Sequence, residues 1–448
     1  MDVGAAVPEL APRASFRAAP RRPCSQCRMQ FVVSALGSAG DVHPFIAISQ
    51  ALQARGHRVQ MIASPYFEAR IRAAGIAFTP LGAPGEFERL LQRPELWHPR
   101  RGTRFVLDEL LNRLPEAFAV TAALSRARDT VLVGSSLSWG LRLVQEHSGL
   151  PAATVHLSPI CLPSATRPSV LPGVGDLSWL PAWALRALQS AAERLLVDRF
   201  VAPRLNRLRA EIGLAPVQRV LSRWMHSPDL VIGAWPDWFA PPQPDWPAQT
   251  RTVGFPLFHE GSNDTGGGLD PSLEAFLAAG PAPIGITPGS AMAHGAAFFA
   301  KAVDACTSLG QRALLISPFH DQLPRVLPAG AMQVGYAPFG ALLPRLRALV
   351  HHGGIGTSAQ ALAAGLAQLV VPFAHDQFDN AARLRRLGVA VTLPTTAPAA
   401  DWRAALRCLL DAPGRAAALR CNAERMTVAG PAASHMAELL ESLGRQRR

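Results

Sequence analysis

Short apolar runs that alternate with glycine turns and helical segments constrain this chain more than any other feature. The run "QFVVSAL" (30–36) leads into "GSAGD", a helical pattern opened by Pro44 follows, and "HRVQMIAS" (57–64) is the next apolar run. Strand, turn, helix and strand make a βαβ unit, whose two strands lie parallel in one sheet. Because proline suits the first helical turn, where no amide donor is needed, we expect the helix to begin at Pro44.

The same order recurs in two series. Apolar runs at 130–136 and 152–158 continue the first, and runs at 282–290, 312–317, 332–338, 348–354 and 367–373 form the second. We expect an amphipathic helix at 184–212 and helices at 401–411 and 414–443. The fold class is therefore α/β, with two Rossmann-like, doubly wound domains facing one another. Such domains bind a ligand in the cleft at the carboxyl ends of their strands.

The segment 239–249 holds four prolines and is the predicted linker between the domains. We predict that residues 1–28 are a tail that is either disordered or precedes the true start at Met29. The segments that follow are an acceptor-binding domain (29–238), the linker (239–249), a donor-binding domain (250–425), and a C-terminal helix with a basic tail (426–448). Residues 1–28 lack the apolar segment of a secretory signal. No uncharged apolar run reaches 18 residues, so no spanning helix is expected.

Basic residues outnumber acidic ones, 44 Lys and Arg against 32 Asp and Glu, which gives a net charge of +12 over 448 residues. Such a balance suits an anionic partner, and it equally fits a genome that favours arginine codons. No block of five or six basic residues appears, so nucleic acid is disfavoured as a partner. Cys24 and Cys27 form a CxxC without a second pair, and the other cysteines fit a reduced, cytoplasmic protein.

A bare glycine turn follows the run at 346–352. Gly353, Gly354 and Gly356 precede a helix expected at 358–364, so the backbone there can approach a ligand closely. Amides at a helix start carry partial positive charge and bind phosphate. The turn predicts a phosphate site, with a tight strand-to-helix connection without a ligand as the alternative.

The stretch "HGGIGTSAQALAAGLAQLVVPFAHDQFDNA" resembles the donor-binding motif of nucleotide-sugar-dependent glycosyltransferases of the GT-B fold. "YAPFGALLP" (336–344) extends this resemblance, and "GSAGDVHPFIAISQALQARGH" (37–57) looks like the N-terminal signature of the bacterial branch. Together these motifs cover residues 29–425.

Four further stretches resemble the rhamnosyltransferases of bacterial rhamnolipid synthesis: "WMHSPDLVIGAWPDWFAPPQPDWP", "TVGFPLF", "YAPFGALLP" and "AHDQFDNAARLRRLG". That resemblance implies transfer of L-rhamnose from dTDP-L-rhamnose to the hydroxyl of a 3-(3-hydroxyalkanoyloxy)alkanoate, which makes a mono-rhamnolipid. It implies no cofactor beyond the donor substrate, a lipid acceptor, weak association with the inner-membrane surface, and contact with the lipid-precursor synthase.

The resemblance also assigns donor-binding roles. The family spacing places His352 at the diphosphate, whereas His351 ends the strand; Asp376 and Gln377 match the pair that holds sugar hydroxyls. The full implied set is Gly289, Ser290, Tyr336, Ala337, His351, His352, Gly353, Gly354, Gly356, Thr357, Gln360, Asp376 and Gln377. Helix capping is the alternative role for Asp376.

Three positions depart from the family pattern. At one of them Phe339 replaces a glutamine, so any hydrogen bond made by that amide is absent. Tyr336 replaces the tryptophan that stacks on the base, and a phenol ring can still stack. Gln360 replaces a glutamate that grips both ribose hydroxyls. Because thymidine nucleotides lack the 2′-hydroxyl, a neutral amide at residue 360 favours a dTDP-sugar over a UDP-sugar.

The acceptor hydroxyl must lose its proton as it attacks the anomeric carbon, so a base is needed in the N-terminal half of the cleft. "GSAGDVHP" offers Asp41, which we favour, and His43 as the second choice. Capping of the following helix is the alternative role for Asp41. The sequence has neither a cluster of metal-ligating residues nor a DxD motif, so we expect no metal-binding residues. We expect direct displacement with inversion at the anomeric carbon.

The acceptor pocket is expected in the loops of the first domain, where apolar side chains would hold acyl chains or simply pack in the core. The candidates are Trp97, Phe105, Trp139, Leu162, Leu171, Trp179 and Trp183. The other functions considered are transfer of another sugar to a polyketide, sterol or flavonoid, sugar epimerisation, and a non-catalytic subunit that docks nucleotide or membrane.

Overall fold

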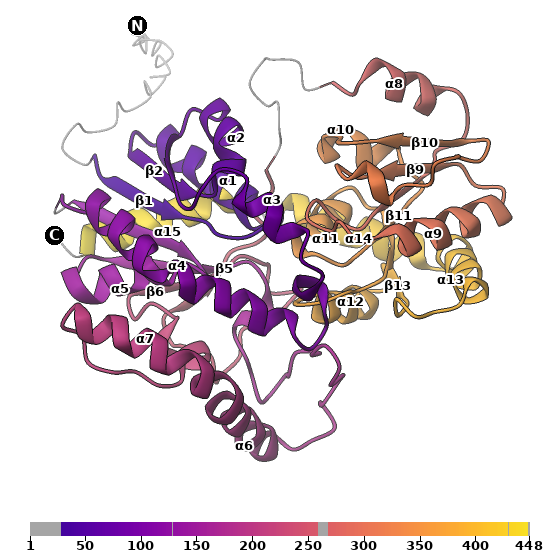
Figure 1. Ribbon diagram of the computed structural model, residues 1–448. Coiled ribbons are helices and arrows are strands. Elements are labelled where there is room, and N and C mark those ends of the chain that lie inside the picture. Colours follow the sequence, from indigo (N-terminus) through magenta and orange to yellow (C-terminus); the bar gives the residue numbers. More distant parts are fainter. Residues whose placement is uncertain (1–27, 128, 259–267, 429, 447–448) are drawn as a thin grey trace, which may run out of the picture.

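The computed structural model describes residues 28–446, apart from 128, 259–267 and 429. Most of the predicted N-terminal tail and the CxxC lie outside these residues. Two lobes lie side by side in Figure 1, each built on one parallel sheet. The prediction of two doubly wound α/β domains is confirmed.

The first sheet has seven strands in the order β3-β2-β1-β4-β5-β6-β7, all parallel. Its strands are β1 (Gln30–Ser34), β2 (Arg58–Ala63), β3 (Ala77–Pro80), β4 (Thr130–Ser135), β5 (Ala152–His156), β6 (Leu230–Gly233) and β7 (Thr250–Thr252). Because β7 pairs with β6, the predicted start of the second domain at residue 250 falls within the first sheet.

Helices cover both faces of this sheet. They are α1 (Ala39–Ala54), α2 (Glu68–Ala73), α3 (Glu86–Leu91), α4 (Gly102–Leu124), α5 (Trp139–Ser148), α6 (Ala182–Ala192) and α7 (Arg199–Glu211), with short turns η2 (Pro65–Phe67), η3 (Pro94–Trp97), η4 (Pro159–Cys161), η5 (Glu193–Asp198) and η6 (Val220–Trp224). Phe31 and Val33 pack towards α1, whereas Val32 packs towards α5. Burial on both faces explains why these strands are continuously apolar.

The second sheet has six parallel strands in the order β10-β9-β8-β11-β12-β13. They are β8 (Ile284–Thr287), β9 (Ala313–Ile316), β10 (Ala331–Val334), β11 (Ala348–His351), β12 (Ala367–Val370) and β13 (Ala390–Thr392). The helical elements of this half are α8 (Pro271–Ala278), α9 (Ala296–Ser308), η7 (His320–Gln322), α10 (Phe339–Leu342), η8 (Leu343–Arg345), α11 (Ile355–Ala363), α12 (Gln377–Arg386), α13 (Ala399–Asp411) and α14 (Arg415–Val428).

Two predicted helix limits are wrong. The helix predicted from Pro44 begins at Ala39, because Ser38 and Asp41 bond to each other and fix its start, and Pro44 lies inside it. The helix predicted over 414–443 is two helices, α14 and α15 (Ala432–Gln446), separated at Gly430, whose φ is 68°, and Pro431.

Helix α15 returns to the first domain and packs on α1 and β4, seen in yellow behind the left lobe of Figure 1. Its Glu441 accepts hydrogen bonds from Arg55 at 2.7 and 2.8 Å and lies 2.7 Å from Nε2 of His57. Those bonds to Arg55 lower the pKa of Glu441 to about 2. The last helix therefore ties the chain's end to the first domain.

An apolar cluster joins the two domains. Trp235, Phe239 and Phe255 from the first half pack with Leu362 of α11 and Leu384 of α12. The proline-rich segment 239–249 is therefore packed against both domains, and the cleft lies between these domains.

Candidate active site

A cavity of about 1760 Å³ lies between the domains, at the carboxyl ends of strands from both sheets. The first domain contributes the loop after β1, Asp41 in the first turn of α1, the loop after β4, and apolar side chains of α4 and α6. The second contributes Gly289, the glycine turn after β11, and the pair Asp376–Gln377. The cavity is large enough for two substrates of several hundred Å³ each.

Asp41 is the third residue of α1 and lines the cavity. Its Oδ2 accepts hydrogen bonds from the amide and the hydroxyl of Ser38 at 2.7 and 3.0 Å. Burial raises the pKa of Asp41, and the bonds from Ser38 oppose that rise. Asp41 therefore caps α1 and faces the cavity at once, so the two roles proposed from sequence do not exclude each other.

His43 is placed differently. Its Nε2 lies 2.9 Å from Nη1 of Arg70, its ring is 5.2 Å from that of Phe258, and it is not among the residues that line the cavity. Because Arg70 always carries its proton, it donates in that contact and occupies the Nε2 lone pair. The alternative base predicted from sequence therefore lies behind Asp41, turned from the cavity.

The glycine turn lies at the N-terminus of α11, where Gly354, Gly356 and Thr357 line the cavity. A β-carbon at Gly356 would lie 3.6 Å from the Cα of Gly40, so α11 and α1 approach each other closely. Two helix N-termini thus meet across the cleft, and both place partial positive charge there. This arrangement suits the negative charge of a diphosphate.

The two neighbouring histidines have different surroundings. His351 is fully buried: its Nδ1 accepts from the amide of Gly353 at 3.1 Å and its Nε2 lies 3.0 Å from Gln368. His352 lines the cavity, and its buried Nδ1 has no hydrogen-bond partner among the described residues. Burial, followed by the proximity of His351, lowers the pKa of His352 to about 3. His352 is therefore neutral, and of the two histidines it is the one that lines the cavity.

Asp376 and Gln377 come at the start of α12 and line the cavity. Asn380 donates to Asp376 at 2.8 Å, and burial raises the pKa of Asp376 to about 6. The side-chain oxygen of Gln377 accepts from the amides of Phe373 and Ala374 at 2.7 and 3.0 Å. Gln377 therefore offers a ligand its NH₂ group, whereas Asp376 offers oxygen.

Three residues that the resemblance assigns to nucleotide binding do not line the cavity: Tyr336, Ala337 and Gln360. Tyr336 is 55% exposed, and the guanidinium of Arg70 from the first domain sits 5.2 Å from its ring centroid. Ala337 is buried, and Gln360 is half-buried on α11. Ser290, in contrast, lines the cavity beside Gly289. The nucleotide roles assigned to Tyr336, Ala337 and Gln360 stay predictions.

Most of the apolar acceptor candidates meet at the cavity. Those that line it are Trp97, Phe105, Trp139, Leu162, Leu171 and Trp183. Trp139 is also fully buried and packs edge-on to Trp224, so it belongs to the core as well. Trp179 is not part of the wall, and its side chain is 74% exposed.

The site includes polar residues that sequence patterns did not single out. Ser136, His156 and His226 form a hydrogen-bonded chain at the wall, and His375 adopts a left-handed backbone, with φ 56°, beside Trp97. These residues come from separate segments of the chain. Only His375, directly before Asp376, lies in a motif that was identified from the sequence. Among the described residues, no three His, Cys, Asp or Glu side chains gather as metal ligands would.

Two family models match the chain. The glycosyltransferase family 28 N-terminal domain matches residues 31–164, and the erythromycin biosynthesis protein CIII-like C-terminal domain matches residues 314–443. Glycosyltransferase GtfC of Amycolatopsis orientalis is 31% identical over 429 residues, which span 92% of this chain and 97% of that protein. O-mycaminosyltylonolide 6-deoxyallosyltransferase of Streptomyces fradiae is 29% identical, over 81% of this chain and 85% of that protein.

Solved structures share the fold. The spinosyn rhamnosyltransferase SpnG complexed with thymidine diphosphate superposes with a TM-score of 0.63 and 22% identity, covering 92% of this chain and all of that one. The glycosyltransferase of kitacinnamycin gives a TM-score of 0.71 and 20% identity, over 93% of this chain and 99% of that one. The architecture is therefore that of glycosyltransferases with two facing Rossmann-like domains.

Proposed function

The chain belongs to the GT-B glycosyltransferases, and from that membership we propose that it transfers L-rhamnose from dTDP-L-rhamnose to the hydroxyl of a 3-(3-hydroxyalkanoyloxy)alkanoate. One observation carries the proposal: a single cavity holds Asp41 of the first domain opposite His352, the α11 N-terminus and Asp376–Gln377 of the second. A base thus faces a diphosphate site and a set of groups for sugar hydroxyls.

The proposed step is a direct displacement. The acceptor oxygen attacks the anomeric carbon, its proton passes to Asp41, and the bond from that carbon to the diphosphate oxygen breaks. The burial that raises the pKa of Asp41 makes it a stronger base than an exposed carboxylate. The charge that leaves on the diphosphate meets the α11 amides and the neutral ring of His352, groups already in place before the reaction. The anomeric carbon is inverted, and no metal takes part.

The walls of the first-domain half of the cavity support an apolar acceptor. Phe105, Leu162, Leu171 and Trp183 line it, beside further leucines of α3 and α4. Acyl chains would bury apolar surface there at roughly 25 cal/mol per Å².

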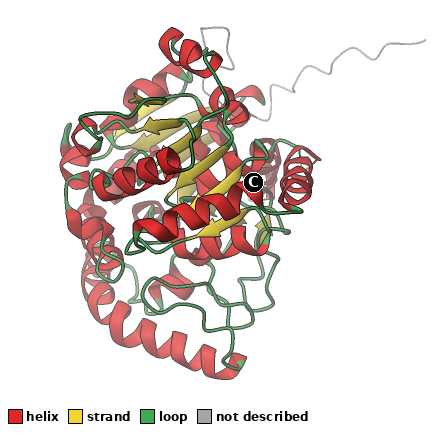
Figure 2. Cartoon of the chain, turned by 90° about the vertical axis from the view of Figure 1, so that its right-hand side faces the viewer, coloured by secondary structure: helices red, strands yellow, loops and turns green. Residues whose placement is uncertain are grey.

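The same apolar surface continues to the outside along α6 and η5, at the lower edge of Figures 1 and 2. Trp183, Leu188, Leu195 and Leu196 are 73%, 47%, 67% and 74% exposed, and exposed Arg186, Arg194 and Arg199 accompany them. We call these seven residues the α6 surface. Aromatic and aliphatic side chains mixed with arginines suit the face of an anionic bilayer, from which a lipid acceptor could enter the cavity. None of the described helices combines the length and apolarity needed to cross a membrane.

A second candidate is transfer to a polyketide. The proteins named above include a transferase for a tylonolide derivative and one structure from spinosyn synthesis, which favours such an acceptor over a sterol or flavonoid. The cavity, with its mixture of apolar walls and polar ends, accommodates a rigid macrolide as well as two acyl chains.

Release of dTDP from dTDP-L-rhamnose tests the proposal. Purified protein is incubated with the donor alone, with a hydroxyalkanoyloxyalkanoate, and with a macrolide aglycone, while UDP-glucose and dTDP-glucose serve as comparison donors. We expect dTDP release that depends on the hydroxy lipid and a product one rhamnose heavier. Release that depends only on the macrolide supports the second candidate, and no acceptor-dependent release with any donor contradicts both.

A further inference from the structure

A long loop of the first domain forms part of the cavity wall. Residues 162–181 connect η4 to α6 without a helix or strand, and they lie between α6 and α12 in Figure 1 and are drawn as loop in Figure 2. Leu162 at the start of this segment and Leu171 and Pro172 near its middle line the cavity. Loops of more than about 15 residues are uncommon in compact domains and are usually functional. We call residues 162–181 the cavity loop.

The start of the cavity loop is held by the linker and by α6. The indole N–H of Trp246 donates to the carbonyl of Leu162 at 2.9 Å, and the side chain of Gln189 donates to the carbonyl of Ser164 at 3.1 Å. These bonds fix the first few residues of the loop, but they do not reach Leu171.

The middle of the cavity loop is held by Asp379 of α12, which belongs to the second domain. Oδ1 of Asp379 accepts a hydrogen bond from the amide of Val170 at 3.0 Å, directly before Leu171. Its Oδ2 accepts from Nε of Arg383 at 2.7 Å. Asp379 is fully buried and does not line the cavity. Its carboxylate therefore acts on the loop and not on a ligand.

The bond to Asp379 comes just before a tight turn. Leu171 and Gly175 exchange backbone hydrogen bonds of 3.3 and 3.0 Å, so residues 171–175 form a unit closed on itself. In the described part of the chain, residues 166–181 make no other hydrogen bond to the second domain. The place of the turn relative to that domain is therefore set by Val170 and Asp379.

The first turn of α12 also carries the candidate sugar-binding residues. Asp376 and Gln377 line the cavity. Asn380 donates to Asp376 at 2.8 Å and to the carbonyl of Gly353 in the glycine turn at 2.9 Å. Because these residues follow one another on one helix, Asp379 holds the cavity loop at a fixed distance from the donor groups.

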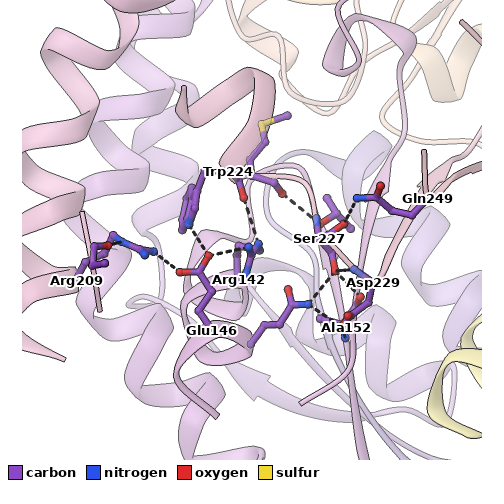
Figure 3. Close-up of polar contacts among 12 residues, drawn as sticks. Arg142, Glu146, Ala152, Arg209, Trp224, Ser227, Asp229 and Gln249 are labelled. Carbon is purple, nitrogen blue, oxygen red and sulfur yellow. Dashed lines mark hydrogen bonds and ion pairs between the residues drawn. The ribbon is translucent and has the colours of Figure 1, made fainter. Parts of the chain in front are cut away.

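Another part of the wall is held within the first domain, as Figure 3 shows. Met225 lines the cavity and follows Trp224, whose carbonyl accepts from Nε of Arg142 at 3.2 Å. Two residues further on, the hydroxyl of Ser227 donates to the carbonyl of Ala152 at 2.6 Å. Both anchors belong to the first domain, so this part of the wall keeps its place without the second domain, unlike the turn of the cavity loop.

We propose that Asp379 is a positioning residue for the acceptor, because it holds the turn 171–175 in place relative to the donor groups of α12. The inference rests on the proposed sugar transfer. An acceptor that packs on Leu171 and Pro172 is then placed by the second domain as well as by the first. Asp379 therefore affects the binding of the acceptor and leaves the binding of the donor as it is.

Two substitutions in the full chain break the bond from opposite sides. Val170→Pro removes the N–H donor and keeps the pair of Asp379 with Arg383, whereas Asp379→Ala removes the acceptor. In both variants we expect the KM of the hydroxyalkanoyloxyalkanoate to rise about 10-fold, while the Kd of dTDP and the hydrolysis of dTDP-L-rhamnose by water stay within about twofold. Val170→Pro is the decisive variant if Asp379→Ala, which leaves Arg383 without its carboxylate, does not fold.

Ser169→Pro is the matched control. It places a proline one residue earlier, where the amide makes no hydrogen bond among the described residues, and it should leave the KM of the lipid unchanged. Amide hydrogen exchange tests the contact without turnover. The Val170 amide, followed in a peptide that covers residues 166–175, should exchange at least about 10-fold faster in Asp379→Ala than in the wild type.

Three results overturn the proposal. The first is equal exchange of the Val170 amide in the wild type and in Asp379→Ala. The second is a KM that is unchanged in Val170→Pro, or that rises as much in Ser169→Pro. The third is a Kd of dTDP that rises as much as the KM, since Asp379 then only supports the start of α12. If the wild type turns over no donor, the proposed function fails, and the exchange experiment still decides whether Asp379 holds the loop.

Discussion

The imidazole of His352 packs directly against the backbone of Gly289: a β-carbon at residue 289 would lie 2.6 Å from its Cε1 and 2.8 Å from its Nε2. The two residues follow the carboxyl ends of neighbouring strands, β8 and β11, which pair in the second sheet. The backbone of Gly289, which lacks a side chain, thus makes room for the His352 ring, and that ring has a buried nitrogen without a partner in the part of the chain that the structure describes.

Gly289→Ala should therefore weaken nucleotide binding. The added methyl group displaces the His352 ring, and we expect the Kd of dTDP to rise about 10-fold or more, because a positioned hydrogen bond to a charged group contributes roughly 1.5–3 kcal/mol. Calorimetric titration measures this. Gly310→Ala is the control, since Gly310 also has positive φ but has open space around it. An unchanged Kd in Gly289→Ala would show that His352 does not contact the diphosphate.

Gln360 provides a test of nucleotide choice. An amide can bind the 3′-hydroxyl of a deoxyribose but cannot match the two charge-assisted bonds that a carboxylate makes to a ribose. The wild type should bind dTDP at least as well as UDP, and Gln360→Glu should shift the ratio towards UDP by about 1 kcal/mol. Titration of both nucleotides into both proteins decides. If the ratio of the dTDP and UDP affinities is the same in both proteins, base contacts near Tyr336 determine the choice of donor instead.

Asp376 should make stability depend on pH. Burial raises its pKa from 3.8 to about 6 in the folded chain, so the unfolded chain loses this proton first as pH rises. Folding is then penalised progressively between pH 4 and pH 6, and the penalty persists above that range. Asp376→Asn removes it, and we expect a gain of roughly 1–3 kcal/mol in the free energy of unfolding at pH 7.

Urea unfolding of wild type and Asp376→Asn at pH 4 and pH 7 measures that gain. The difference between the two proteins should be much smaller at pH 4, where the carboxyl is protonated in the folded chain and, with a pKa of 3.8, is only about half ionised in the unfolded chain. A variant that is less stable at pH 7 would mean that the carboxylate is held by contacts stronger than its bond with Asn380.

The α6 surface should bind anionic vesicles. We expect the wild type to co-sediment with phosphatidylglycerol vesicles at low salt, and Leu188→Ser with Leu195→Ser to reduce the bound fraction several-fold, since each buried leucine contributes about 1.5–3 kcal/mol. Val326→Ser, at an 85% exposed position of the second domain, is the control. Two results would argue against a lipid-binding face at α6. One is equal binding of the double leucine variant and Val326→Ser, and the other is equal binding of the wild type to neutral and anionic vesicles.

Local patterns predicted the parts of the site that lie within one strand–turn–helix segment. Asp41, the glycine turn with His352, and the pair Asp376–Gln377 all follow strands directly, so parallel topology brings them to one edge. Their finer geometry depended on contacts that no periodicity reveals: the oxygen of Gln377 is used by the backbone, and Arg70 reaches both His43 and Tyr336.

The chain of Ser136, His156 and His226 could not be predicted in this way. Its members come from three segments, and each alone is an ordinary polar residue at a strand end or in a loop. Only the pairing of β4 with β5 and the anchoring of η6 bring them together. The predicted start of α1 was wrong for a related reason. The hydrogen bonds between Ser38 and Asp41 fix the start of this helix, although Pro44 also suits a first helical turn.

The central claim is that Asp41 takes the proton of the acceptor hydroxyl in this cavity, and the turnover of Asp41→Asn tests it most directly. An asparagine oxygen can still accept from Ser38, so α1 and the cavity should remain as they are. We expect the Kd of dTDP to stay near that of the wild type while kcat for transfer falls 10²–10⁴-fold, roughly 3–5 kcal/mol in the barrier. If Asp41→Asn keeps more than about a tenth of the wild-type kcat, Asp41 serves only as the cap of α1, and the account of the site is contradicted.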